Sequence, residues 1–198
     1  EQAGRQPRMN WLQARARADD LQVRLARRLA ELEQEGQLAA LPPVVVGGAL
    51  VVPEGLLAGL AGEAHPEPAA MARETQRVEA LAMQAVVHTE LQLGCVPRDV
   101  SREHCGWDIE SQDPATGRLR FIEVKGRVTG ARTVTVTKNE ILASLNKPEA
   151  FILALVEVDG DTTTCRYLRG PFQREPDFGV TSVNYDLAEL WTRAEEPA

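Results

Sequence analysis

Aromatic residues, cysteines and long apolar runs are all scarce in this sequence. Aromatic residues make up 5% of the 198 residues, so the core must be mainly aliphatic. No apolar run approaches the roughly 20 residues that a bilayer-spanning helix needs, so no membrane association is expected. The three cysteines, Cys95, Cys105 and Cys165, form no CxxC pair. A disulfide framework or a zinc module is therefore not expected, and a reducing, cytoplasmic location is predicted.

The chain also lacks an initiator methionine and a signal-peptide pattern. We therefore expect a piece of a longer protein or a trimmed chain. Its 43% hydrophobic and 26% charged residues are ordinary for a folded protein. A chain of this length suits one domain with an appendage, or two small domains.

The net charge of −7 disfavours a free-standing protein that coats nucleic acid. The charge is uneven, however, because residues 118–147 carry a net charge of about +5. Their basic side chains are Arg118, Arg120, Lys125, Arg127, Arg132, Lys138 and Lys147. This stretch is either a solvated surface or a surface that contacts phosphate groups.

The N-terminal third predicts an extension ahead of the main domain. Residues 10–39 have leucines at helical spacing, at positions 21, 25, 29 and 32, which indicates a helix with a narrow apolar stripe. Such a stripe packs on an upstream domain or on a second copy of the chain. Val44–Val46 and Ala49–Val52 flank two glycines and predict a β-hairpin.

Residues 61–69 contain two prolines and predict a linker. We therefore divide the chain into an extension, 1–69, and a main domain, 70–198. The domain opens with a predicted helix over 70–93, which Gly94 ends. The apolar side of this helix carries Val78, Ala82, Ala85, Val86, Thr89 and Leu93.

Two carboxylates, Glu79 and Glu90, lie on the flank of that apolar stripe. A carboxylate there is costly to bury without a partner, so each is a candidate for a functional site. The alternative is a boundary glutamate whose head reaches water, and it is the favoured interpretation for Glu90.

Beyond Gly94 the pattern predicts mainly strands. Strands are expected near 95–100, 106–113, 118–126, 132–136, 150–158 and 162–169, with helices near 138–147 and 185–194. Trp107 is expected to pack in the core or under a helix, and Tyr185 and Trp191 to pack the last helix. The predicted fold is α/β (α+β), with a mixed central sheet flanked by helices.

The turn Pro114–Gly117 joins two of these strands into a hairpin. If Asp113 pairs with Arg118, then Asp108 lies opposite Glu123, and their Cβ atoms are about 5.5 Å apart. Lys125 lies two residues after Glu123 and therefore on the same face. A shift of one residue would move Asp108 to the other face.

Like charges directly opposite each other destabilise a sheet, so this pair needs a cation. Mg²⁺ takes one or two carboxylates and keeps several waters, which suits Asp108 and Glu123. Lys125 could then orient a water molecule or stabilise charge that develops on a phosphate. Glu79 could add a carboxylate from the preceding helix.

A helical Glu79, then Asp108, then Glu123-x-Lys125 resembles the motif of the PD-(D/E)xK nuclease superfamily. The wider run VEALAMQAVVHTELQLG, DVS, GWDIES, RFIEVKG, VTVTKNEI and FILALVEV resembles one branch of it, the NO VEIN C-terminal-like domain. The resemblance covers roughly residues 72–194. That branch is uncharacterised and often ends large bacterial helicase-like ATPases, some of them linked to phage defence.

The resemblance implies a restriction-endonuclease-like core and Mg²⁺- or Mn²⁺-dependent cleavage of nucleic acid, with DNA the expected substrate. Asp108, Glu123 and the carbonyl of Val124 would hold the metal, Lys125 would position the water and Glu79 would assist. The residues expected to contact nucleic acid are Arg127, Arg132 and Lys138. An upstream helicase-type ATPase region is the expected partner.

Two alternatives remain open. Thr137 and Glu140 match the S/T-x-x-E capping box at the start of a helix. This capping role for Glu140 is favoured over the alternative, in which Glu140 lies at the rim of the site. The whole domain could also be an inactive module that binds nucleic acid or protein, with the four motif residues forming a structural charge network.

Overall fold

A computed structural model of the chain divides it into two units, residues 1–52 and 53–198. The structure describes residues 11–39, 44–45, 47–48, 50, 52, 54–62, 68–177 and 179–198. In the first unit, α1 (Trp11–Gly36) is the helix predicted over 10–39. None of its residues is buried, and its leucine stripe is exposed.

The predicted hairpin at 44–52 lies partly outside the described residues. Those of its residues that are described belong to no strand. Instead, α2 (Glu54–Ala61) follows, where the sequence predicted no helix. Most of the predicted linker, residues 63–67, also lies outside the described part of the chain.

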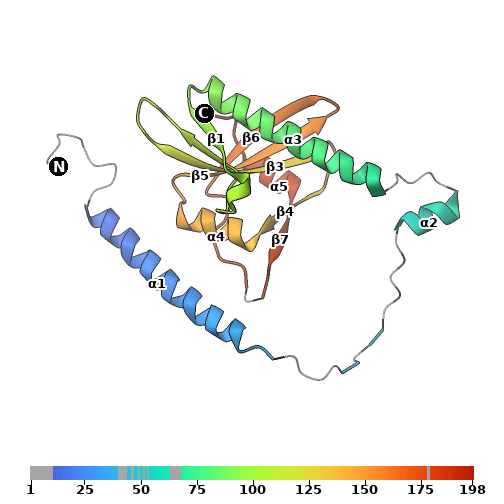
Figure 1. Ribbon diagram of the computed structural model, residues 1–198, viewed down its shortest axis with the longest axis horizontal. Helices are drawn as coiled ribbons and strands as arrows, with labels where there is room; N and C mark the ends of the chain where they lie inside the picture. The colour runs from blue at the N-terminus through green and yellow to red at the C-terminus, as the bar shows by residue number, and fades with distance from the viewer. Residues whose placement is uncertain are drawn as a thin grey trace. The chain divides into compact units, whose positions relative to one another are not determined.

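The main sheet has five strands in the order β1-β2-β3-β5-β6 (Figure 1). The strands are β1 (Val96–Asp99), β2 (Ile109–Gln112), β3 (Leu119–Val128), β5 (Phe151–Asp159) and β6 (Thr162–Arg169). Strands β3 and β5 are parallel, and the other neighbours are antiparallel. The predicted mixed sheet is therefore confirmed.

A second, two-stranded antiparallel sheet pairs β4 (Thr133–Thr137) with β7 (Ser182–Asp186). The remaining elements are α3 (Pro68–Gln92), the short 3₁₀ helix η1 (Ser101–Glu103), α4 (Lys138–Asn146) and α5 (Leu187–Arg193). Strand β7 was not predicted. Tyr185 was expected on the last helix but lies in β7, opposite Val134.

Helix α3 covers one face of the main sheet, and α4, α5 and the small sheet cover the other (Figure 1). Strand β5 is buried on both faces, as is usual for an interior strand of a sheet that is covered on both sides. Its even-numbered residues from Ile152 to Val158 pack toward α3, and Leu153 and Leu155 pack toward α4 and α5. The core is aliphatic, as the composition predicts.

Two glycines fix how α3 meets the sheet. Gly94 has a φ of 77° and ends the helix as predicted, with the Cys95 amide donating to the Glu90 carbonyl at 2.9 Å. Gly126 of β3 lies directly under α3, because a Cβ there would approach the Cβ of Ala82 to 2.7 Å. The helix therefore packs tightly against β3 beside Lys125.

Candidate active site

One cavity of about 430 Å³ lies between α3, η1, β3 and α4. It is lined by Glu79, Ala82, Met83, Ser101, Asp108, Glu123, Val124, Lys125, Gly126, Arg127 and Glu140. All four residues predicted to be catalytic lie in its wall, together with Glu140. Residues from four separate elements thus meet in one place.

The hairpin register that brings Asp108 to this cavity is the predicted one. Ile109 lies opposite Ile122, and the Asp113 amide donates to the Arg118 carbonyl at 2.9 Å. Strand β2 begins only at Ile109, so β3 continues past it without a β2 partner. The open edge of β3 forms part of the cavity wall.

Asp108 partly fills this open edge with its side chain. Its Oδ2 accepts a hydrogen bond from the Val124 amide at 2.9 Å, and its own amide donates to the Ile122 carbonyl at 2.9 Å. The amide and carbonyl of one strand residue point to the same edge. The Val124 carbonyl therefore also points toward Asp108, where a third oxygen ligand was predicted.

Glu123, Lys125 and Glu140 form a charged chain across the cavity. The Lys125 ammonium lies 2.7 Å from Glu123 Oε1 and 2.8 Å from Glu140 Oε2. All three side chains are largely shielded, with 6%, 14% and 14% of their surface exposed, respectively. A lysine held between two carboxylates in a shielded site is strongly attracted to both.

Burial shifts the pKa values of this group. It raises the pKa of Glu123 to about 8, an effect that Lys125 opposes and that Asp108 and Glu140 increase. Burial also raises the pKa of Asp108, although the hydrogen bond from the Val124 amide and the charge of Lys125 act to lower it. Burial alone would lower the pKa of Lys125. The negative charges of Glu123 and Glu140 outweigh this effect of burial, so the pKa of Lys125 is raised. The site thus holds more acid than its one lysine can neutralise.

Glu140 plays both of the parts that the sequence left as alternatives. The Thr137 amide donates to Glu140 Oε2 at 3.0 Å, and the Glu140 amide donates to Thr137 Oγ1 at 3.3 Å, so the capping box is present. The same Oε2 atom reaches Lys125. The capping signal revealed the local role, whereas the contact with β3 depends on how α4 packs.

Glu79 and Glu90 have different surroundings. Glu79 is exposed on α3 and lines the cavity. Glu90 has no exposed surface, which corrects the expectation that its head reaches water. The Tyr167 hydroxyl donates to its Oε1 at 2.9 Å, and Arg120 lies 3.4 Å from the same atom. Glu90 is therefore a buried, paired acid of the core, away from the cavity.

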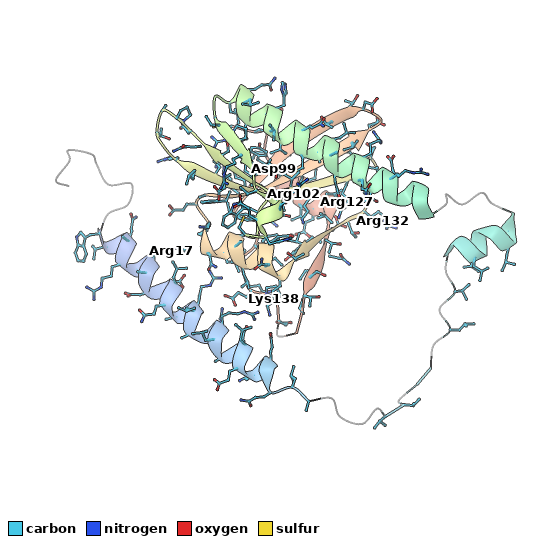
Figure 2. All side chains as sticks on the ribbon, in the orientation of Figure 1. Arg17, Asp99, Arg102, Arg127, Arg132 and Lys138 are labelled. Carbon is cyan, nitrogen blue, oxygen red and sulfur yellow. The ribbon has the colours of Figure 1, made fainter. Side chains whose placement is uncertain are left out.

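The predicted basic stretch is not one continuous patch. Arg120 pairs with Glu90, Lys125 with two glutamates, and Lys147 lies over the ring of Phe121. Arg127 donates to the Gly126 and Thr133 carbonyls, at 2.7 and 3.2 Å. Among the residues predicted to contact nucleic acid, Arg132 is exposed and Lys138 half-buried (Figure 2).

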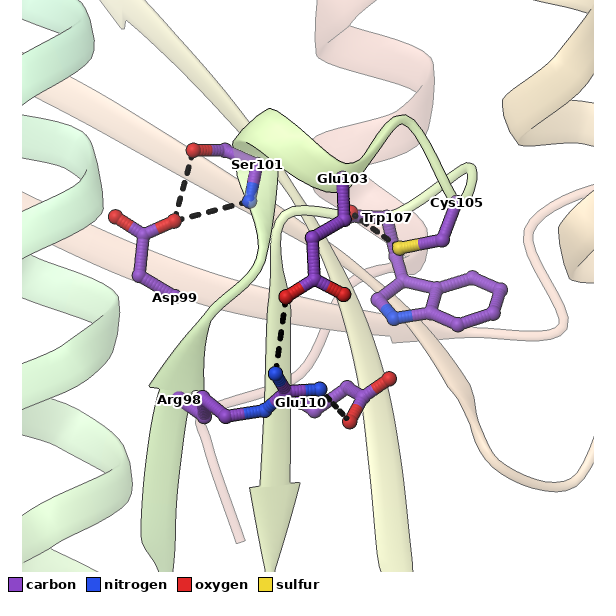
Figure 3. Close-up of polar contacts among 7 residues, drawn as sticks. All are labelled: Arg98, Asp99, Ser101, Glu103, Cys105, Trp107 and Glu110. Atoms are coloured by element: carbon purple, nitrogen blue, oxygen red, sulfur yellow. Dashed lines mark hydrogen bonds and ion pairs between the residues drawn. The ribbon is translucent and has the colours of Figure 1, made fainter.

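The segment between β1 and β2 is held by its own polar contacts (Figure 3). Arg98 lies 2.9 Å from Glu103 and 2.8 Å from Glu110. Asp99 accepts hydrogen bonds from the amide and hydroxyl of Ser101, at 3.0 and 2.7 Å. These contacts fix η1, and with it the Ser101 side of the cavity.

Trp107 precedes Asp108 and packs on Phe121, with ring centroids 4.7 Å apart. The Lys147 ammonium lies over both rings, at 5.0 Å from the Trp107 centroid and 4.3 Å from that of Phe121. The half-buried tryptophan thus packs against β3, which agrees with the predicted packing role.

The donors of the cavity fit a hard divalent cation. Asp108, Glu123 and the Val124 carbonyl offer only oxygen atoms, which suit Mg²⁺ or Mn²⁺. Three carboxylates also surround one lysine, so the cavity carries excess negative charge that an added cation would neutralise. Among the described residues, no group of three or more His, Cys, Asp or Glu side chains is arranged so that it could hold a metal ion. The fit is to a two-carboxylate site completed by water.

Residues 78–168 match the family model described as Protein NO VEIN, C-terminal. The match runs from α3 to β6 and includes Asp108, Glu123, Lys125 and Glu140. No curated protein and no solved structure matches the chain. None of the helices in the described part of the chain combines the length and apolarity that a membrane crossing requires.

Proposed function

We propose that residues 70–198 form a nuclease domain of the PD-(D/E)xK superfamily, with a restriction-endonuclease-like core, which hydrolyses phosphodiester bonds in DNA. The observation that carries this proposal is the meeting of Asp108, Glu123 and Lys125 in one cavity at the open edge of β3. The mixed sheet with helices on both faces and the match of residues 78–168 also support it.

Asp108, Glu123 and the Val124 carbonyl would hold Mg²⁺ or Mn²⁺ in this domain. The ion would supply Lewis-acid chemistry and neutralise charge on the phosphate. Lys125 would donate a hydrogen bond to the attacking water or to a phosphate oxygen. Water would add to phosphorus as the bond to the leaving oxygen breaks. The proton of the water would pass to solvent or to Glu79 at the cavity, and the leaving oxygen would take a proton from solvent to become a hydroxyl.

Arg132 and Lys138 are suited to bind the DNA backbone beside the cavity. Arg132 is exposed ahead of β4, and Lys138 begins α4, next to Glu140. Lysine and arginine contacts to phosphates position a nucleic acid without reading its sequence. Arg127, whose guanidinium already binds two carbonyls, would serve mainly to shape the cavity wall.

The parent protein proposed for this domain is a cytoplasmic helicase-type ATPase with a role in phage defence. This part of the proposal rests on the resemblance of the motif run to domains that end such proteins. In that setting the motor would deliver DNA to the nuclease cavity, and α1 would couple the domain to the motor or to a second copy.

The experiment that tests this function is a cleavage assay with the full chain. Single- and double-stranded DNA and RNA are incubated with Mg²⁺ or Mn²⁺, and with EDTA as the blank. We expect metal-dependent cleavage of DNA, which Asp108→Asn and Lys125→Met each reduce on the order of 100-fold or more. Glu149→Gln is the matched control, because this exposed carboxylate lies outside the cavity.

A second candidate function is an inactive binding module of the same fold. The observation that favours it is the contact of Lys125 with both Glu123 and Glu140, which gives each carboxylate a cationic partner without a metal. This candidate predicts DNA or protein binding that EDTA and Asp108→Asn leave unchanged. Absence of cleavage for every substrate and metal, together with such binding, would favour it over the nuclease.

A further inference from the structure

The place of a cation in this cavity is taken by a side chain of the protein. The Lys125 ammonium lies within 2.8 Å of a carboxylate oxygen of Glu123 and of Glu140. Glu123 is also a residue proposed to hold the metal. A divalent ion on Glu123 and an ammonium 2.7 Å from the same carboxylate would repel each other strongly in this shielded site.

Glu140 offers Lys125 a second position. It belongs to α4, whereas Glu123 and Lys125 belong to β3, so the two carboxylates approach the lysine from different elements. The capping box fixes Glu140, because the Thr137 amide donates to the same Oε2 atom that contacts Lys125. Helix α4 is itself anchored by the buried Ile141.

We propose that Lys125 is a built-in competitor for the divalent metal, and that Glu140 is the positioning residue that retains Lys125 when the metal takes Glu123. This inference rests on the proposed function, since it concerns the same metal site. It implies that metal binding and the movement of Lys125 off Glu123 occur together. Lys125 would then remain beside the cavity, close to the water that it is proposed to orient.

Substitutions of Lys125 and Glu140 should affect metal binding in opposite directions and should not be additive. Lys125→Met removes the competing charge, so we expect it to tighten metal binding about tenfold. Glu140→Gln places a glutamine at the capping position, where it can still complete the capping box, but removes the charge that draws Lys125 away from Glu123. We therefore expect it to weaken metal binding several-fold. In the double variant the effect of Glu140→Gln should disappear, because Glu140 acts through Lys125.

The experiment is a calorimetric titration of Mn²⁺, and then of Mg²⁺, into the full chain and its three variants at one pH. Thr137→Val is the control for the capping role of Glu140. It removes the hydroxyl half of the capping box but leaves the contact of Glu140 with Lys125. We expect it to lower the melting temperature and to leave the metal affinity unchanged within twofold.

Two outcomes would overturn the inference in distinguishable ways. If the wild type binds metal and Glu140→Gln weakens binding equally with and without Lys125, Glu140 acts on the metal directly. The competitor role then falls while the metal site stands. If the wild type and Lys125→Met both fail to bind metal, the inference and the proposed metal-dependent function fall together.

Discussion

Glu123 is the residue on which burial and charge act most strongly. Burial raises its pKa to about 8, with Asp108 and Glu140 acting in the same direction. A carboxyl whose pKa is raised in the folded state stabilises the fold at low pH only. The contribution is fully present below its unfolded pKa, near 4.5, and is lost as the pH rises through about 8.

The first prediction follows from that sign. Without metal, the wild-type protein should lose stability relative to Glu123→Gln as the pH rises from about 4.5 to about 8, because the side chain of the variant does not titrate. Urea unfolding in EDTA at several pH values measures the difference. Parallel pH profiles for the two proteins would show that Glu123 is ionised and accommodated across this range.

A second residue-scale prediction concerns the buried Glu90. Tyr167→Phe removes the hydroxyl that donates to Glu90 and leaves a carboxylate oxygen in the core without that partner. The cost should be about 1–3 kcal/mol of unfolding free energy. Ser111→Ala is the control, because the buried Ser111 hydroxyl has no hydrogen-bond partner among the described residues. An equal loss for both variants would contradict this role of Tyr167.

Glu90 also shows where prediction from single residues ends. Val78, Ala82, Val86 and Glu90 recur every four residues along one side of α3, and all four are buried. The pattern placed Glu90 on the flank of that stripe. It could not reveal that Tyr167, 77 residues later in the chain, would donate the hydrogen bond that offsets the cost of burying this carboxylate.

At the scale of elements, the contact between α3 and β3 depends on the absence of a side chain at Gly126. Gly126→Ala would place a Cβ 2.7 Å from the Cβ of Ala82 and 3.0 Å from the Val78 carbonyl oxygen. We expect a loss of about 1–3 kcal/mol, because α3 must move away from the sheet.

Chemical unfolding of Gly126→Ala, Ala82→Gly and the double variant measures this contact. Ala82→Gly should itself cost about 1 kcal/mol in helix propensity. The loss caused by Gly126→Ala should be smaller in the Ala82→Gly background, since the clash is then relieved. Additive losses would mean that the two positions do not press on each other.

Elements with strong local signals could be predicted, and those defined by distant partners could not. The turn Pro114–Gly117 fixed the β2–β3 register, and the capping box marked the start of α4. Strand β7 was missed because it is short, runs directly into α5 and pairs with β4 about 50 residues earlier. Its end does carry a local signal, because Asp186 caps α5.

The candidate site follows the same rule. Glu123 and Lys125 belong to one β-hairpin, and Asp108 directly precedes its first strand. That the three side chains lie close together could therefore be predicted from the hairpin register and from the alternation of side chains along a strand. Glu140 comes from the next helix, and only its capping role was visible in the sequence. Its contact with Lys125 depends on the packing of α4 against the sheet.

At the scale of the whole molecule, α1 is a 26-residue helix with an exposed leucine stripe and no buried residue. Most of the stability of a helix in a protein comes from packing its apolar face against a partner. The C-terminal half of α1 carries arginines at 24, 27 and 28, followed by glutamates at 31, 33 and 35, and Arg28 pairs with Glu31 and Glu35 within the helix. An antiparallel pair of copies would place the basic turn of one helix beside the acidic turn of the other.

We therefore predict that the full chain dimerises through α1 and that a truncation to residues 60–198 is monomeric. Light scattering of both proteins across a concentration series measures their masses. Leu25→Glu in the stripe should give the mass of a monomer in the full chain. A monomeric full chain would contradict the prediction and leave an upstream domain as the partner of α1.

The most direct test of the account is a crystal structure of the full chain grown with Mn²⁺ and measured at a wavelength where manganese scatters anomalously. We expect one anomalous peak between Asp108 and Glu123, with the Lys125 ammonium in contact with Glu140 and no longer in contact with Glu123. Manganese bound elsewhere, or a Lys125 that still bridges both glutamates in crystals saturated with the metal, would contradict it.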